Sequence, residues 1–379
     1  MRVLEVTEAS GSGTLEVVST LAEGLDRSGH DVAVAWGARP ETPDYLATRL
    51  SPGVEQISLG WERRTAGAQL RAAGALRRLA KRWAPDVIHL HSSFAGAVGA
   101  VAVGRRHPTV YTPHAYAFSR AGDMPARRAA YRLVEGMVVR RCDLLGAVSE
   151  AEAELGRRKL AAPRVAVVPN GIRELDTEAP PRSVPRGARP LVVCMGRIGP
   201  QREPEASAQI LGALARRADV RWIGGAPGSE RAPLDAAGIP VTGWLDRGAA
   251  LDQLSGATVL LHWSAWDGQA LAVLEALARD VVVVASDIPA NREIVGASQV
   301  RATTDEAIAL IGRLLSEPDL VERFLDNQRR ARHRWSAERM VADWIGVYEA
   351  LIRSPRAASR RPSRREPSPE PRTIGRQWN

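Results

Sequence analysis

The sequence predicts an α/β protein made of two doubly wound domains that face each other across a cleft. First, short apolar strand patterns alternate with helical patterns from the first residue, starting with RVLEVTE. Second, a Pro-rich, polar stretch at residues 176–190 interrupts this alternation. Third, a new alternating series begins with LVVCMGRI directly after the interruption. Buried strands that alternate with helices form parallel sheets with right-handed crossovers, so each series predicts one such domain.

The first series begins with a strand at residues 2–8 and a Gly-containing turn, GSGT, at 11–14. The helix that follows has apolar residues at helical spacing and stops at Gly29. We expect basic helices at about 64–83 and at 126–141, and further strands at 30–37, 86–92, 108–114, 144–149 and 164–172.

The second series has its first helix at about 203–217 and a helix that starts near Ala270. We expect the other elements of this series as strands at 220–225, 239–244, 257–264 and 281–286, and as helices at 247–255, 304–315, 318–332 and 336–352. The predicted units are therefore a first domain at 1–175, a linker at 176–190, a second domain at 191–335, a helix at 336–353 that crosses back to the first domain, and a tail at 354–379.

The tail, SPRAASRRPSRREPSPEPRTIGRQWN, has almost no large apolar residues, so we predict that it is disordered. It carries seven Arg and two Glu, which is more than half of the formal net charge of +9. Of the 52 basic residues only Lys81 and Lys159 are Lys, a bias that is typical of a GC-rich genome. There is no zinc-finger spacing and no platform of stacking aromatics, so the sequence does not favour a nucleic-acid partner.

Composition also indicates the cellular compartment of the protein. No run of eighteen apolar residues occurs, so no transmembrane helix is predicted, and the N-terminus lacks the pattern of a secretory signal. Cys142 and Cys194 stand far apart in apolar contexts, which is typical of two unpaired thiols in a reduced, cytoplasmic protein.

The stretch WDGQALAVLEALA carries two carboxylates, Asp267 at a turn and Glu275 in the second turn of a helix. The turn lies beyond the carboxyl end of a strand, and a helix N-terminus there offers free N–H groups to a phosphate. Gly268 lets a backbone approach closely. A carboxylate on an apolar helix is costly to bury without partners, and two adjacent ribose hydroxyls would be suitable partners. The alternative is that Asp267 caps the helix and that Glu275 lies on the surface.

Three other stretches place polar groups after strands. Gly196, Arg197 and Arg202 follow the strand LVVCM, and two guanidiniums there would suit a diphosphate, although solvated loop arginines are an alternative. His114 follows the strand PTVYT, and could bond a phosphate or a sugar hydroxyl or have a structural role. Gly13 belongs to GSGT, which does not match the dinucleotide-binding fingerprint.

The sequence gives little support for a metal site or for a catalytic nucleophile. His89 and His91 alternate on one strand, but the sequence shows no cluster of partners for a metal ion. There is no Gly-x-Ser-x-Gly nucleophile elbow.

Six motifs, in their order and spacing, resemble those of the family-4 retaining glycosyltransferases, whose fold is GT-B, with two Rossmann-like domains. WDGQALAVLEALA resembles the acid-x7-acid motif of that family, and GRIGPQREPE resembles its Gly-Arg stretch followed by a basic residue. VIHLHSSFAGAVGA, YTPHAYAF, AVSEAE and VVPNGI resemble its N-terminal-domain and hinge motifs. The resemblance spans roughly residues 1–350 and is nearest to glycosyltransferases of capsular polysaccharide and exopolysaccharide synthesis.

The resemblance implies a role for each matching residue. The second domain would bind the nucleotide sugar, and the first would lie on the acceptor side. Glu275 would hold the ribose, Asp267 would contact the donor sugar, and His114 would face the donor from the other domain. The diphosphate would be held by Arg197, Arg202 and the backbone N–H groups of Gln269, Ala270 and Leu271, with Gly13, Gly196 and Gly268 lining the site. Thr242, Gly243 and Trp244 would form the base pocket.

The resemblance implies a hexosyltransferase-type enzyme that needs no metal and no cofactor and that uses a nucleoside-diphosphate sugar as co-substrate. It would act on a hydroxyl of a sugar, a small molecule or a lipid-linked or polysaccharide precursor. Two departures from the family pattern stand out: Asp267 replaces the usual Glu and is shorter by about 1.5 Å, and Arg202 replaces the usual Lys.

Two basic helical segments with apolar faces, 63–83 and 126–141, are compatible with docking on an anionic membrane surface at the inner face of the membrane. A solvated Arg face over a core-facing stripe is the alternative for each. Other functions remain open at this point: a nucleotide-sugar epimerase or hydrolase on the same fold, a non-catalytic nucleotide-sugar-binding protein, and a nucleic-acid binder that depends on the basic tail.

Overall fold

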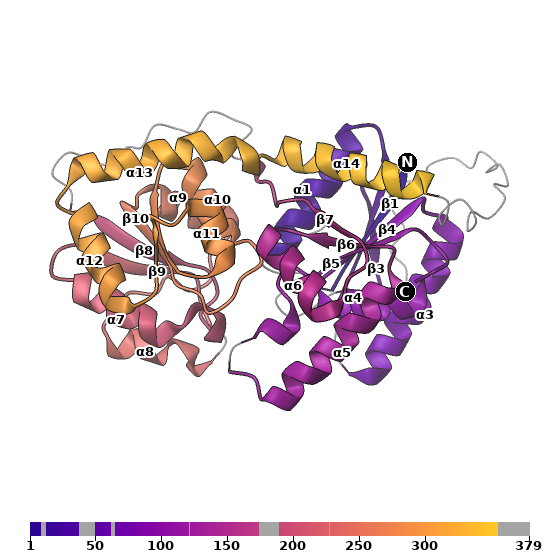
Figure 1. Cartoon of the computed structure of the whole chain (residues 1–379), viewed down its shortest axis with the longest axis horizontal. Helices are drawn as coiled ribbons and strands as arrows, with labels where there is room; N and C mark the ends of the chain where they lie inside the picture. Colours follow the sequence, from indigo (N-terminus) through magenta and orange to yellow (C-terminus); the bar gives the residue numbers. More distant parts are fainter. Residues whose placement is uncertain are drawn as a thin grey trace.

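The computed structural model describes residues 1–8, 13–37, 50–61, 65–120, 122–173, 189–226 and 228–354. Two parallel β-sheets, each covered by helices, lie side by side along the long axis (Figure 1). The predicted α/β class and the two-sheet arrangement are therefore confirmed. Residues 176–188 of the predicted linker, 355–379 of the predicted tail, and Gly11 and Ser12 of the turn lie outside the described residues.

The N-terminal sheet has seven strands in the order β3-β2-β1-β4-β5-β6-β7. The strand order reverses between β1 and β4, and ligands bind at such a switch point beyond the carboxyl ends of the strands. The elements are β1 (Arg2–Thr7), α1 (Gly13–Arg27), β2 (Asp31–Trp36), β3 (Glu55–Ser58), α3 (Ala66–Trp83), β4 (Val87–His91), α4 (Ser93–Ala102), β5 (Thr109–Thr112), η1 (Ala117–Ser119), α5 (Pro125–Arg141), β6 (Leu144–Ala147), α6 (Glu150–Leu160) and β7 (Val165–Val167).

The C-terminal sheet has five strands in the order β12-β11-β10-β8-β9, and its switch point lies between β8 and β10. Its elements are β8 (Leu191–Met195), η3 (Pro200–Arg202), α7 (Pro204–Leu214), β9 (Asp219–Ile223), η4 (Ser229–Arg231), α8 (Ala232–Ala236), α9 (Arg247–Ser255), β10 (Val259–His262), α10 (Leu271–Ala278), β11 (Val282–Ser286), α11 (Pro289–Val295), β12 (Val300–Arg301), α12 (Thr304–Leu314), α13 (Pro318–Ala331), η5 (Arg332–Trp335) and α14 (Ala337–Arg353).

Most strands consist mainly of apolar residues because helices cover both faces of each sheet. The five residues of β11, Val282–Ser286, are all buried, as are the four of β10. The N-terminal sheet also buries one acid and two histidines: Glu5, His89 and His91 are each at most 1% exposed. Because burying such groups is costly unless they are hydrogen-bonded, they mark a position where the core is specialised.

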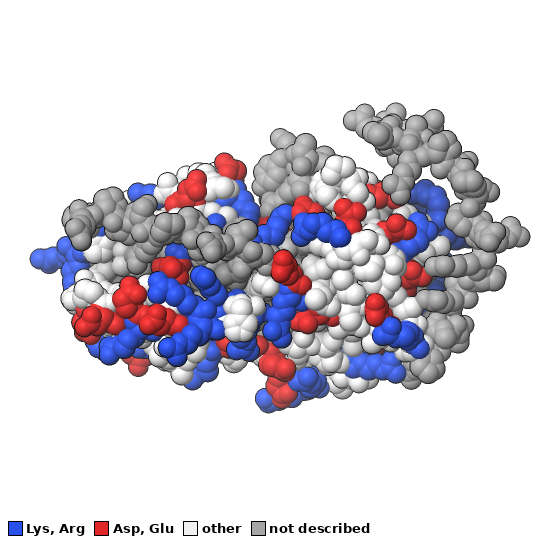
Figure 2. All heavy atoms as spheres, turned by 90° about the horizontal axis from the view of Figure 1, so that it is seen from above, with Lys and Arg blue, Asp and Glu red and all other residues white. Residues whose placement is uncertain are grey.

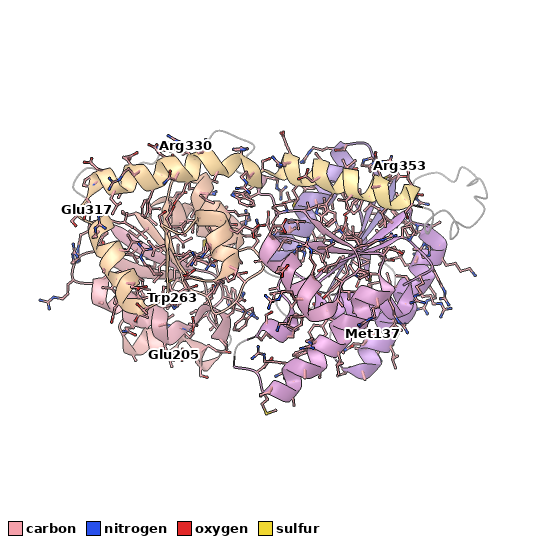
Figure 3. The ribbon with its side chains drawn as sticks, viewed as in Figure 1. Met137, Glu205, Trp263, Glu317, Arg330 and Arg353 are labelled. Atoms are coloured by element: carbon pink, nitrogen blue, oxygen red, sulfur yellow. The ribbon has the colours of Figure 1, made fainter. Side chains whose placement is uncertain are left out.

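The last two long helices, α13 and α14, run along one side of both sheets, where Arg330 and Arg353 mark them (Figures 1 and 3). Helix α14 packs against α1, and its Trp344 and Tyr348 are buried in the N-terminal core. The chain crosses from one sheet to the other twice. The two crossing segments meet where Ile172 N–H donates to the Trp335 carbonyl at 3.0 Å.

The predicted strand at 239–244 is wrong. Residues in this segment form isolated bridges, Val241 with Trp222 and Gly243 with Gly224, and no strand of the sheet. The positive φ of Gly243, 75°, turns the chain away from a ladder geometry. Six strands and α-helices were not predicted at all: β3, α4, α6, α8, α11 and β12. Most of these are short or, like α4 with its Gly and Ala residues, have a weak pattern.

No helix among the described residues is long and apolar enough to cross a membrane. Lys and Arg are interspersed with Asp and Glu over the face that carries α13 and α14 (Figure 2). The described residues on this face therefore do not form a single-sign surface of the kind that nucleic-acid binding requires.

Candidate functional site

Arg202 is the centre of a polar cluster at the switch point of the C-terminal sheet. Its Nη1 donates to Asp267 Oδ2 at 2.7 Å and lies 3.0 Å from His262 Nε2, and it also contacts Ser264 Oγ. Arg202 is the last residue of η3, the short helix that follows β8. His262 is the last residue of β10, and Asp267 lies in the turn after it. Trp263, between them, is buried in the core beyond β10 (Figure 3). Sheet topology thus joins two segments that are 60 residues or more apart.

The cluster controls the charge of Asp267. Burial opposes ionisation, but the Arg202 guanidinium and His262 outweigh it and hold the pKa of Asp267 well below its usual range. Burial and the Arg202 charge lower the pKa of His262 to about 4, although Asp267 acts in the opposite direction. At neutral pH the group is therefore an ionised Asp267 beside a neutral His262 and a charged Arg202.

Within the Arg202 side chain, Nη1 is the nitrogen that forms the hydrogen bonds found among the described residues. The guanidinium has five donors in a planar fork, so Nη2 and Nε can serve an anionic ligand. The alternative of solvated loop arginines is wrong for Arg202, whose side chain is 17% exposed. Arg197 differs, because it is exposed and forms no ion pair within the described part of the chain.

Helix α10 begins beside this cluster. Its N-cap is Ala270, with no side-chain cap, so the interpretation that Asp267 caps the helix is wrong. Asp267 Oδ1 instead accepts from the N–H of Gly268 at 3.0 Å. The uncapped N–H groups of the first turn and the positive end of the helix dipole are suited to a negative charge.

The start of α10 contacts the N-terminal domain directly. The Gln269 Oε1 atom accepts from Asn170 N–H at 2.6 Å. A Cβ on Gly268 would lie 2.9 Å from the Ala115 N atom, and one on Gly13 would lie 3.3 Å from Leu271 Cδ1. Glycine is needed at 268 because the two backbones approach this closely.

Glu275 is buried, 3% exposed, so the interpretation that it lies on the surface is wrong. Its partner is Arg247 at the start of α9, whose Nη1 contacts Glu275 Oε1. Arg247 also lies 3.5 Å from Glu16 of α1, which in turn pairs with Arg173 at 3.4 Å. A chain of ion pairs therefore joins Glu275 to the N-terminal domain.

His114 follows β5 on the opposite side of the site. Both His114 and Ala115 have positive φ, 50° and 78°, which is uncommon for non-glycine residues and is frequent at functional sites. Two buried acids hold this segment: Glu152 accepts from Ala115 N–H at 2.7 Å, and Glu135 accepts from Ala117 N–H at 2.9 Å. His114 Nε2 lies 2.9 Å from His91 Nδ1, so its Nδ1 is the ring nitrogen left for a ligand.

The three residues assigned to a base pocket lie beside β9. Thr242 Oγ1 accepts from Gly224 N–H at 3.0 Å and donates to the Gly243 carbonyl at 2.9 Å. Trp244 is 63% exposed, and a Cβ on Gly225 would lie 3.2 Å from its Nε1. Gly196, at the end of β8, has a φ of 124° and accepts from Trp222 Nε1 at 2.8 Å.

Glu5, His89 and His91 each offer a metal-ligand atom, and these atoms lie within 4.8 Å of one another. The sequence did not reveal this cluster, because Glu5 comes from the neighbouring strand β1, opposite His89 in the register. All of the ring nitrogens and carboxylate oxygens concerned are already hydrogen-bonded, to one another or to Thr112, His114 and Tyr348. We therefore describe the cluster as a hydrogen-bond network.

Sequence reasoning missed several residues that complete the site: Glu16, Arg247, His262, Ser264 and Glu293. Glu293 Oε1 accepts from the N–H of Glu150 at 3.0 Å, so an acid of one domain caps helix α6 of the other. The available signal was weak, because a His before a Trp at a strand end and an Arg at a helix start occur in many folds.

Buried ionisable groups make the stability depend on pH. Burial raises the pKa of Glu5 to about 8 and those of Glu135 and Glu152 to about 7. Between pH 4.5 and these raised pKa values the folded protein binds more protons than the unfolded chain. The free energy of unfolding therefore falls as the pH rises through this range. Burial lowers the pKa of His91 to about 3 and that of His262 to about 4, which has the opposite effect below pH 6.5.

Above pH 6.5 the effect of the histidines fades while Glu5 still titrates between the two states, so we expect the Tm to fall between pH 6.5 and 8.5. Each acid contributes up to about 1 kcal/mol per pH unit within its window. Thermal unfolding followed by circular dichroism across this range measures the effect, and Glu152→Gln should reduce the slope. A Tm that stays constant or rises in this range would contradict the expectation.

Comparison with known proteins places these features in a family. The family model described as "Glycosyl transferase 4-like domain" matches residues 12–171, and the model described as "Glycosyl transferases group 1" matches residues 189–325. Among curated proteins, Glycosyltransferase 1 domain-containing protein 1 of Xenopus tropicalis is 35% identical over 99 residues, covering 24% of this chain and 27% of that protein. MMP alpha-(1->4)-mannosyltransferase of Mycolicibacterium hassiacum is 35% identical over 106 residues, 26% of each chain. The aligned part is thus about a quarter of either relative.

Solved structures resemble the fold over nearly the whole chain. Sucrose-phosphate synthase of Thermosynechococcus elongatus has a TM-score of 0.81 at 18% identity, with 93% of this chain and 99% of that one covered. Anabaena Alr3699/HepE, in complex with UDP and glucose, has a TM-score of 0.75 at 16% identity, with 92% and 100% covered. With the two family models matched in order on the two sheets, the chain belongs to the family-4 glycosyltransferases and has the GT-B fold.

Proposed function

We propose that the protein is a retaining glycosyltransferase that moves a hexose from a nucleoside-diphosphate sugar to a hydroxyl acceptor. The observation that carries the proposal is the Arg202–Asp267–His262 cluster beside the uncapped start of α10, with buried Glu275 in the same helix and His114 on the opposite domain. The matched HepE structure holds UDP and glucose, which supports a nucleotide sugar as the ligand class.

In the proposed binding mode, the Glu275 carboxylate accepts from the two ribose hydroxyls and the exposed Trp244 indole, with Thr242 and Gly243, faces the base. The diphosphate lies against Arg202 Nη2, the exposed Arg197 and the N–H groups of residues 269–271. Asp267 and His114 then contact the sugar. Arg bonds phosphate in a bidentate way, so the Arg in place of the family's usual Lys is compatible with this role.

The proposed chemistry follows from these charges. A bond forms between the acceptor oxygen and the anomeric carbon while the bond from that carbon to the diphosphate oxygen breaks. Because the acceptor attacks on the face of the leaving group, its proton passes to the departing phosphate oxygen and the configuration is retained. Arg202 and the dipole of α10 stabilise the negative charge that collects on the diphosphate in the transition state.

This proposal assigns charge stabilisation to side chains and a helix end, so it includes no metal ion and no cofactor. Transfer should therefore persist at an unchanged rate after dialysis against EDTA. A loss of activity that Mg²⁺ or Mn²⁺ restores would replace this part of the proposal with metal-assisted departure of the diphosphate.

The test of the function has two stages. A thermal-shift screen against nucleoside diphosphates and their common sugars identifies the base and the sugar, because a ligand that binds only the folded state raises the Tm. The selected donor is then incubated with candidate acceptors, and NMR of the product reads the anomeric configuration. Product without any acceptor would favour an epimerase or hydrolase, and binding without turnover would favour a non-catalytic binding protein.

We also propose that the acceptor is lipid-linked and that the protein docks on an anionic membrane from the cytoplasmic side. Three neighbouring helices expose apolar side chains, Leu70 of α3 at 73%, Val101 of α4 at 58% and Leu133 of α5 at 77%. Exposed basic residues of α3 and α5 flank them: Arg71, Arg77, Arg78, Lys81, Arg82, Arg127, Arg128 and Arg132. Apolar insertion together with basic charges is the pattern of interfacial helices.

The membrane proposal predicts flotation with vesicles that contain anionic lipid and none with purely zwitterionic vesicles. Each basic residue near the surface contributes about 1 kcal/mol, so Arg128→Glu combined with Arg132→Glu should lower the bound fraction severalfold. Arg313→Glu, on the exposed face of α12, is a control that should float like the wild type. Equal flotation with both vesicle types, or none with either, would contradict docking by charge.

A further inference from the structure

A line of hydrogen bonds leads from the candidate site into the N-terminal sheet. His114 Nε2 lies 2.9 Å from His91 Nδ1, and His91 Nε2 lies 2.6 Å from Glu5 Oε2. The links come from three different elements: the segment after β5, the end of β4 and the middle of β1. The sheet order, with β1 beside β4 and β4 beside β5, is what brings them into line.

The far end of the line is fixed by α14. Tyr348 donates to Glu5 Oε1 at 3.1 Å, and its oxygen lies 2.7 Å from His89 Nδ1. The hydroxyl has one proton, so while it donates to Glu5 it accepts from His89, whose Nε2 then accepts from Thr112 Oγ1 at 2.8 Å. Oε1 of Glu5 is therefore an acceptor, and Oε2 is the oxygen that faces His91.

Both imidazoles in the line are neutral. Burial lowers the pKa of His91 to about 3 and holds the pKa of His114 well below its usual range. A neutral imidazole has one N–H and one bare nitrogen, so a proton at one ring nitrogen determines the role of the other. The line therefore has two self-consistent proton arrangements.

When Glu5 is protonated, its Oε2–H donates to His91 Nε2, His91 Nδ1–H donates to His114 Nε2, and His114 carries its proton on Nδ1. When Glu5 is ionised, it accepts from His91 Nε2–H, His91 Nδ1 accepts from His114 Nε2–H, and His114 Nδ1 is bare. One proton is lost between the two arrangements, and it leaves from His114 Nδ1. The ring nitrogen that faces the ligand thus changes from a donor to an acceptor.

We propose that Glu5 is a positioning residue that acts through His91 to keep the Nδ1 proton on His114, so that His114 donates a hydrogen bond to an oxygen of the nucleotide sugar. The role in binding rests on the proposed function, whereas the coupling of Glu5 to the His114 tautomer does not. Glu5 and His91 touch no ligand in this assignment, and each acts through its neighbour.

The protonated arrangement prevails near neutral pH. Burial raises the pKa of Glu5 to about 8, and the Tyr348 hydrogen bond acts in the opposite direction. The groups that face Glu5 are His91 and His89 from β4 and Tyr348 from α14, whereas β2 contributes the apolar Val34 at the paired position. Raising the pH through about 8 should therefore remove the donor at His114.

Glu5→Gln tests the coupling directly. The amide oxygen can accept from Tyr348 while the amide N–H donates to His91 Nε2, which reproduces the protonated arrangement at every pH. In protein labelled with ¹⁵N-histidine, long-range ¹H–¹⁵N spectra distinguish Nδ1–H from Nε2–H tautomers. We expect His114 of the wild type to change from Nδ1–H to Nε2–H as the pH rises through about 8, and His114 of the variant to stay Nδ1–H.

Tyr348→Phe is a second variant, and it tests in which direction the pH of the tautomer change moves. It removes the hydrogen bond that lowers the pKa of Glu5, so the tautomer change should move to higher pH. Thr112→Val is the matched control, because it removes a buried hydrogen bond to His89 without touching the line from Glu5 to His114. The control should leave the midpoint of the tautomer change where it is in the wild type.

Donor binding supplies an independent readout. Losing one hydrogen bond should weaken nucleotide-sugar affinity about tenfold in the wild type between pH 7 and 9, and the affinity of Glu5→Gln should stay constant over this range. The proposal is overturned if the His114 tautomer is the same in wild type and both variants at every pH. A protein that binds no nucleotide sugar but shows the coupled tautomers would refute the proposed function and leave the coupling standing.

Discussion

Replacing Arg202 by alanine should lower kcat by about 10²–10³-fold, because a preorganised charge at the leaving diphosphate is lost. It should also destabilise the fold by about 3–5 kcal/mol, since Asp267, 10% exposed, keeps its negative charge without its ion-pair partner. Steady-state kinetics with the donor and acceptor found by screening, together with chemical unfolding, measure the two effects.

A double-mutant cycle with Asp267→Asn separates the two effects. Asparagine keeps the shape of the side chain and removes its charge, so Arg202→Ala should cost less stability in that background than alone. Its effect on kcat should persist, because the missing charge acts on the diphosphate. Arg231→Ala breaks an exposed ion pair with Asp235 on α8 and should change neither measurement. Full activity of Arg202→Ala would remove Arg202 from the mechanism.

Replacing Glu275 by alanine should weaken nucleoside-diphosphate binding by about 10²–10⁴-fold. Two ribose hydroxyls lose a charged acceptor, and hydrogen bonds to charged groups contribute about 1.5–3 kcal/mol each. The sugar part of the donor should matter little to this loss, so the nucleoside diphosphate and its nucleotide sugar should weaken in parallel. Isothermal titration calorimetry measures the affinities, and Glu275→Gln should fall between alanine and the wild type.

Arg247→Ala should have the opposite effect of Glu275→Ala on the response to the nucleotide. The Arg247 guanidinium lies against Glu275, where the ribose is proposed to bind. Without it, the unliganded protein should melt at a lower temperature, and the nucleotide should raise the Tm by more than in the wild type, because its hydroxyls replace the missing partner. An equal loss of binding in Arg247→Ala and Glu275→Ala would instead show that the two residues form a structural ion pair.

The architecture was readable because the elements that build it are long and strongly patterned. The helix at 336–352 repeats apolar residues at helical spacing, and the strands at 86–92 and 281–286 are rich in Val and other large apolar residues. The prediction of a strand at 239–244 was wrong because IPVTGW is only a short apolar run. A positive φ at Gly243 turns this segment out of the sheet. Apolar runs of this length do not distinguish a strand from an irregular segment.

The candidate site was readable only in part. Asp267, Arg202 and His114 were predicted as site residues because each follows a strand, and the carboxyl ends of parallel strands meet at one edge of a sheet. Their partners, among them His262, Arg247 and the Glu5–His91 line, could not be found. A hydrogen bond between residues 86 positions apart, such as that from His91 to Glu5, leaves no periodic trace in one sequence.

By itself the sequence determined the two-sheet α/β class, the position of the break between the sheets, and the acid, base and Gly residues that follow the strands. These depend on local spacing and on burial, which act over a few residues along the chain. Tertiary structure alone decided which charges are paired: Glu275 with Arg247, Arg202 with Asp267, and His114 with His91. Pairing is set by strand order and by contacts between domains, and those energies arise only after the chain has folded back on itself.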